Sequence, residues 1–134
     1  MANALYPKWK EQLLQFTANN NLSAGTVKVA LIDTGTYTYN SADQFWSSAS
    51  SASVGTPQTI GSKTFTNGTF DGADVTFTAV TGNSVEALIL FIDTGSSATS
   101  PLVAYIDTSV TGLPVTPNGG DITITWNASG IFAL

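Results

Sequence analysis

The sequence predicts a mainly β protein, a single-domain antiparallel β-sandwich or barrel with one N-terminal α-helix. Three observations support this class. Short apolar runs rich in β-branched residues recur along the 134 residues, polar turn sequences separate these runs, and helical spacing is confined to residues 6–18. A chain of this length buries enough apolar surface for one core, so we expect residues 1–134 to form one domain.

Residues 86–108 are expected to form a central hairpin. They contain the two most apolar runs of the chain, residues 87–92 and 102–106, joined by a polar loop rich in Ser, Thr and Gly. Both runs are apolar at nearly every position, which is typical of strands with protein on both faces. The other strands should therefore be arranged around this pair.

The N-terminal helix is predicted over residues 6–18. Pro7 suits the first turn, and Trp9, Leu13 and Phe16 share one side at helical spacing. We expect this apolar stripe to pack on the sheet. The alternative is that the stripe docks on a partner molecule.

A strand and then a long loop are predicted after the helix. Residues 27–32 have the composition of a strand, which residues 37–39 would extend beyond a turn. Residues 40–59 are rich in Ser and Ala, with Phe45 and Trp46 as their aromatic side chains, and are expected to form a loop with one helical turn. Such long loops are commonly functional or mobile; the alternative is a surface loop that the two rings pin to the core.

Short strands are predicted next, at residues 64–67, 69–71 and 75–80. Asn-Gly and Asp-Gly sequences between them are turn signals. The alternation of apolar and polar residues in these strands places Phe65 and Phe70 on the buried side of the sheet.

Two further apolar segments complete the chain. Residues 121–126 alternate regularly, with Ile122, Ile124 and Trp126 on one face. Residues 131–134 form an apolar terminus that is costly to expose, so we expect it to pair at a sheet edge or to insert into a neighbouring subunit.

Composition argues against several functions. The chain has no Cys and no His, and its four basic residues, all lysines, give a formal net charge of -5. This balance argues against nucleic-acid binding, and the lack of His removes the usual general base and a common metal ligand. No apolar run is long enough to cross a membrane, and we expect a soluble protein made in the cytoplasm. Asp71 and Asp74, or Asp93 and Asp107, could hold a hard cation such as calcium. At the Asp71–Asp74 loop, solvated turn carboxylates are the favoured interpretation, so no metal or cofactor is expected.

An Ile-Asp-Thr phrase ends three predicted strands, at Asp33, Asp93 and Asp107. The Asp-Thr-Gly sequences at Asp33 and Asp93 resemble the active-site phrase of aspartic proteases, in which two carboxylates share a proton. The third copy exceeds the two that a dyad needs, and Asp at a strand end is an ordinary turn former. We therefore expect turns, no catalytic residue and no enzyme activity, with the protease as the minor alternative.

Several segments resemble a family of small virion proteins encoded in the structural gene clusters of tailed bacteriophages. The resemblance lies in residues 1–8 (MANALYPK), 27–34 (VKVALIDT), 70–82 (FDGADVTFTAVTG), the hairpin 86–108 and 111–126 (TGLPVTPNGGDITITW). It covers most of the chain, which departs from the family in the Ser/Ala-rich residues 47–53.

The resemblance implies a non-enzymatic capsid cement or decoration protein. Its partners would be the major capsid protein and copies of itself, as a dimer or trimer, on the capsid surface of a virion assembled in the bacterial host cytoplasm. The alternative within the virion is a tail, neck or head-fibre component that binds a host-surface carbohydrate through aromatic residues such as Trp46. The candidate contact residues are apolar side chains near the termini and in the long loop. They are Leu5, Tyr6, Trp9, Phe45, Trp46, Phe132 and Leu134.

Overall fold

The structure is a computed structural model that describes residues 3–108 and 110–134. As predicted, it is mainly β, with antiparallel sheets and, among the described residues, one α-helix near the N-terminus. The elements are, in order, β1 (Ala4–Leu5), α1 (Pro7–Leu14), β2 (Thr26–Ile32), the 3₁₀ helices η1 (Trp46–Ser48) and η2 (Ser50–Ala52), β3 (Ser53–Thr59), β4 (Thr64–Thr66), β5 (Thr69–Asp71), β6 (Val75–Phe77), β7 (Ala87–Asp93), β8 (Leu102–Ile106), β9 (Ile122–Ile124) and β10 (Phe132–Ala133).

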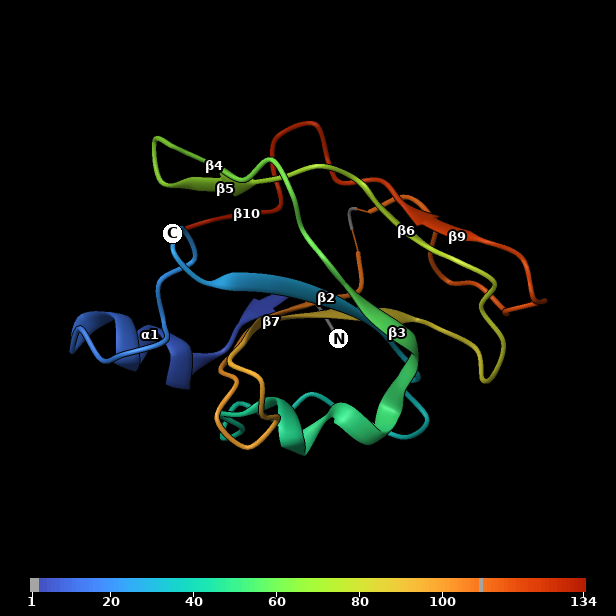
Figure 1. The fold of residues 1–134 in the computed structure, drawn as a ribbon, viewed down its shortest axis with the longest axis horizontal. Helices are drawn as coiled ribbons and strands as arrows, with labels where there is room; N and C mark the ends of the chain where they lie inside the picture. The colour runs from blue at the N-terminus through green and yellow to red at the C-terminus, as the bar shows by residue number, and fades with distance from the viewer. Residues whose placement is uncertain (1–2, 109) are drawn as a thin grey trace.

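A five-stranded antiparallel sheet in the order β1-β8-β7-β2-β3 forms the centre of the molecule. The predicted hairpin is confirmed, because β7 pairs with β8, and Leu88 lies opposite Ile106 on one side and Leu31 of β2 on the other. The segment with η1 and η2 covers one face of this sheet, and the strands of two smaller sheets lie over the other face (Figure 1). Coverage of both faces explains why β7 and β8 are apolar and buried almost throughout.

Helix α1 is shorter than predicted. It begins at Pro7 as expected, but it ends at Leu14, because Phe16 adopts a left-handed backbone conformation (φ 55°). The amide of Phe16 donates to the Leu13 carbonyl and the amide of Thr17 to the Gln12 carbonyl, which is the Schellman pattern of helix termination. Phe16 therefore leaves the helix and does not share the buried face with Trp9.

The predictions for residues 37–39 and 40–59 are wrong in part. The chain leaves the sheet after β2 in a turn closed by the Tyr37 amide on the Asp33 carbonyl, so residues 37–39 do not extend the strand. The end of the predicted loop is the edge strand β3, in which Val54 lies opposite Leu31. Gly55 (φ 72°), near a register shift, and Pro57 weaken the strand signal, yet both are tolerated at a sheet edge.

The remaining strands form two small sheets, β10-β5-β4 and β6-β9. Strands β4, β5, β6 and β9 lie where the sequence predicts strands. The C-terminal residues pair at a sheet edge, with Phe132 opposite Phe70, which confirms the first of the two arrangements predicted for them. The prediction that Phe65 is buried is wrong: its side chain is 48% exposed, because β4 is the outer strand of its sheet.

Candidate functional site

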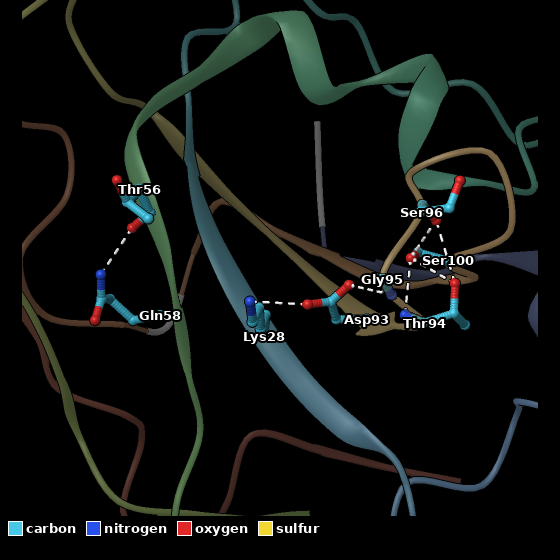
Figure 2. A network of polar contacts seen from close by, with 8 residues as sticks. All are labelled: Lys28, Thr56, Gln58, Asp93, Thr94, Gly95, Ser96 and Ser100. Carbon is cyan, nitrogen blue, oxygen red and sulfur yellow. Dashed lines mark hydrogen bonds and ion pairs between the residues drawn. The ribbon is translucent and has the colours of Figure 1, made fainter.

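The Asp-Thr-Gly sequences form the same turn at two strand ends. Asp33 Oδ1 accepts the Gly35 amide at 2.9 Å, and Asp93 Oδ1 accepts the Gly95 amide at 2.9 Å; the second turn is shown in Figure 2. Each carboxylate thus closes the loop that follows its strand, as expected of turn-forming aspartates. The third copy of the strand-ending sequence is Asp-Thr-Ser at residues 107–109, and residue 109 lies outside the described residues.

Asp33 and Asp93 lie at opposite ends of the central sheet. Strands β2 and β7 are antiparallel, with Thr26 opposite Asp93 and Ile32 opposite Ala87. Asp33 lies seven residues beyond Thr26, and each residue of a strand adds about 3.3 Å. Because Thr26 is opposite Asp93, roughly 23 Å separates the two aspartates. They cannot share a proton, so the protease dyad that was the minor alternative from the sequence does not form.

Asp93 instead forms an ion pair. Lys28 Nζ lies 2.8 Å from Asp93 Oδ2 (Figure 2). The hydrogen bond from Lys28 and then that from the Gly95 amide hold the pKa of Asp93 below its usual value. Both side chains of the pair are partly exposed, so its contribution to stability is small, about 0 to 1 kcal/mol.

Asp33 gives a test of the turn assignment. Hydrogen bonds from the Gly35 amide, Thr36 and Asn83 hold its pKa below the usual value, so Asp33 stabilises the fold above pH 4 and loses this effect as the pH falls. The substitution Asp33→Ala should lower the urea midpoint at pH 6, and the difference from wild type should shrink towards pH 2. Asp121→Ala, at a carboxylate that accepts one backbone amide, is the control with a smaller expected effect. An equal effect at pH 6 and pH 2 would contradict this assignment.

All four tyrosines of the chain gather in one cluster. The Tyr6 and Tyr37 hydroxyls lie 2.9 Å apart, and Tyr37 donates to Asp43 Oδ2 at 2.9 Å. The ring of Tyr39 lies 5.1 Å from that of Tyr6 and 5.5 Å from that of Tyr105. Tyr6, a predicted contact residue, is therefore part of the buried framework.

The other predicted contact residues differ in exposure. Trp9 and Trp46 are buried, as Tyr6 is. Three others, Leu5, Phe45 and Phe132, are partly buried, and Leu134 is 72% exposed. Trp46 is 7% exposed, and its ring stacks on Phe91 with the centroids 4.3 Å apart. Trp46 thus holds the long segment on the central sheet.

An apolar groove of about 270 Å³ lies beside α1, and we call it the helix groove. Four large hydrophobic residues are exposed in the described part of the chain, and three of them lie at the rim of the groove: Phe16 (98% exposed), Leu134 and Phe65. Of the predicted contact residues, the groove brings together Trp9 and Leu134. The lining residues are Trp9, Gln12, Leu13, Phe16, Thr17, Asn20, Asn21, Leu22, Ser23, Phe65 and Leu134.

Hydrogen bonds and ring contacts hold the helix groove in shape. Trp9 packs edge-on against Phe132 with the centroids 5.8 Å apart, and its indole N–H donates to the Asn20 carbonyl at 3.3 Å. Lys63 Nζ donates to the Leu22 carbonyl at 2.7 Å and to two other carbonyls of the same loop. No lining residue carries a charged side chain, so the groove suits an uncharged apolar group.

Asp71 and Asp74 are bound to backbone amides. Asp71 Oδ1 accepts the Gly72 amide at 2.8 Å, and Asp74 Oδ1 accepts the Trp126 amide at 3.0 Å. Within residues 3–108 and 110–134, no three Asp or Glu side chains are grouped so that they could hold a metal ion. In the same part of the chain, none of the helices has the length and apolar content needed to cross a membrane.

No protein-family profile matches this chain, and no curated protein matches it.

Proposed function

We propose that this chain is a structural virion protein, a capsid cement or decoration protein that binds the major capsid protein through the helix groove. The observation that carries the proposal is the gathering of Phe16, Phe65 and Leu134 around one groove. Isolated exposed apolar side chains are common on proteins, but a cluster around a concave surface is typical of an interaction site. The resemblance to phage virion proteins supports the choice of partner.

A modest contact suffices for this role. A groove of about 270 Å³ accepts one or two side chains and not a large interface. Copies repeated by the symmetry of a capsid, or linked in a dimer or trimer, gain affinity from simultaneous attachment. Weak contacts could therefore stabilise the boundaries between capsid subunits.

The alternative function, host-surface binding through Trp46, has less support. A sugar-binding aromatic residue presents a ring face to the solvent, whereas Trp46 is almost fully buried and stacks on Phe91. The helix groove is a more accessible apolar surface than this ring.

The substitution Phe16→Asp should weaken binding to phage heads at least about tenfold, because it removes the largest exposed apolar group of the groove and adds a charge. Leu14→Asp is the matched control, because Leu14 is 87% exposed nearby but does not line the groove. The measurement is co-sedimentation of purified protein with heads that lack it, after circular dichroism has shown that each variant is folded. Absence of wild-type binding would overturn the proposed function, and equal binding of the two variants would place the contact elsewhere.

A further inference from the structure

A row of aromatic rings crosses the sheet β10-β5-β4 and ends at an open strand edge. The ring centroids of Trp9 and Phe132 lie 5.8 Å apart, those of Phe132 and Phe70 5.4 Å, and those of Phe70 and Phe65 5.4 Å. Trp9 and Phe70 are buried, whereas Phe65 is 48% exposed. The row thus ends at β4, whose outer edge pairs with no strand among the described residues.

The backbone of Phe65 points towards this open edge. Asn67 and Gly68 have positive φ angles and form a two-residue turn, with Thr66 opposite Thr69 and Phe65 opposite Phe70. In such a hairpin, the pair next to the turn exchanges hydrogen bonds and the following pair does not. The Phe70 carbonyl accordingly accepts the Ile131 amide at 2.8 Å, on the side away from β4. The N–H and C=O of Phe65 therefore face outward.

The helix groove also contains a buried acceptor. Asn20 is 5% exposed, and its Oδ1 has no hydrogen-bond donor in the described part of the chain. Its Nδ2 donates to the Ala18 carbonyl at 2.8 Å and to Thr17 Oγ1 at 2.9 Å, so exchanging the two amide atoms would place oxygen against a carbonyl. An unpaired buried acceptor is costly, so a donor that reached Asn20 Oδ1 would stabilise the complex.

We propose that the partner of the helix groove is an extended, uncharged apolar segment of the major capsid protein, which adds as a strand to the outer edge of β4. This inference rests on the proposed function. The outward N–H and C=O of Phe65 would pair with the segment, and an apolar side chain beside Phe65 would continue the aromatic row. Asn20 lines the groove, so a rotation of its side chain on binding would let Oδ1 accept a donor from the segment. The absence of charged side chains in the lining matches an uncharged occupant.

The test compares Phe65→Pro with Phe65→Ala in the head-binding assay. Both substitutions remove the ring, but only proline also removes the outward N–H, and proline is tolerated at an edge position whose N–H faces solvent. We expect Phe65→Pro to bind heads about tenfold more weakly than Phe65→Ala. In wild-type protein, hydrogen exchange at the Phe65 amide should slow at least tenfold on binding to heads.

The outcomes separate this inference from the proposed function. If wild-type protein binds heads but the two variants bind equally and the Phe65 amide stays unprotected, strand addition is wrong and the cement function stands. If wild-type protein does not bind heads, the proposed function itself fails. Thermal unfolding of both variants shows whether a difference in binding arises from loss of folding.

Discussion

Raising the pH from 9 to 11 should lower the free energy of unfolding by about 3 kcal/mol through Tyr6 and Tyr37 alone. Burial, followed by the hydrogen bond with Tyr37, raises the pKa of Tyr6 far above its usual value, and burial raises the pKa of Tyr37 to about 12. The unfolded chain ionises both tyrosines near pH 10, whereas the folded chain keeps them neutral. A pKa raised by folding gives stability that is complete below pH 10 and is lost above it.

Two measurements check this prediction. Urea unfolding at pH 9, 10 and 11 gives the loss of stability, and the 295 nm absorbance of tyrosinate should rise with unfolding and not ahead of it. The substitution Tyr37→Phe removes one of the two ionisations. The loss of unfolding free energy between pH 9 and pH 11 that these two tyrosines cause should therefore fall by about one half. A folded protein whose tyrosines ionise near pH 10 would contradict the buried cluster.

The second large effect is expected at Trp9. Replacing Trp9 with Ala should cost about 3 to 5 kcal/mol of stability, because this buried indole packs on Phe132 and donates to the Asn20 carbonyl. Phe16→Ala should change stability by less than about 0.5 kcal/mol, because the Phe16 side chain is 98% exposed. Chemical denaturation at pH 7 measures both values.

This comparison separates framework from contact surface. If Trp9→Ala weakens head binding, loss of folding and loss of part of the groove lining both contribute, whereas Phe16→Asp should weaken binding in a folded protein. A Trp9→Ala variant as stable as wild type would show that Trp9 does not belong to the core.

Much of the fold was predictable because burial leaves a clear pattern in the sequence. The strands β7 and β8 are apolar at consecutive positions, and the Asn67-Gly68 turn has a characteristic sequence. The strand β3 was not predicted, because its Ser, Gly, Thr and Pro residues are those of a loop, and its pairing with β2 depends on a distant segment. The end of α1 was missed because Phe16 takes a backbone conformation that is usually adopted by glycine.

The candidate site was less predictable than the fold. The helix groove combines five residues of α1 and the turn after it, residues 20–23, Phe65 and Leu134, and no local pattern indicates that these segments meet. The five residues are Trp9, Gln12, Leu13, Phe16 and Thr17. Large apolar residues near the termini were predicted as contacts, but tertiary packing buries Tyr6 and Trp9 and leaves Leu134 accessible. Phe16 and Phe65 were missed, because their spacing is also that of core residues.

The pairing of β10 with β5 determines how the protein can be labelled or displayed. The Leu134 amide donates to the Gly68 carbonyl at 2.9 Å, and Leu134 lines the helix groove. An affinity tag or fluorescent protein attached at Leu134 would therefore lie at the groove and compete with its occupant. A cargo on the surface loop at residues 96–99, none of which lines the groove, should leave the groove accessible.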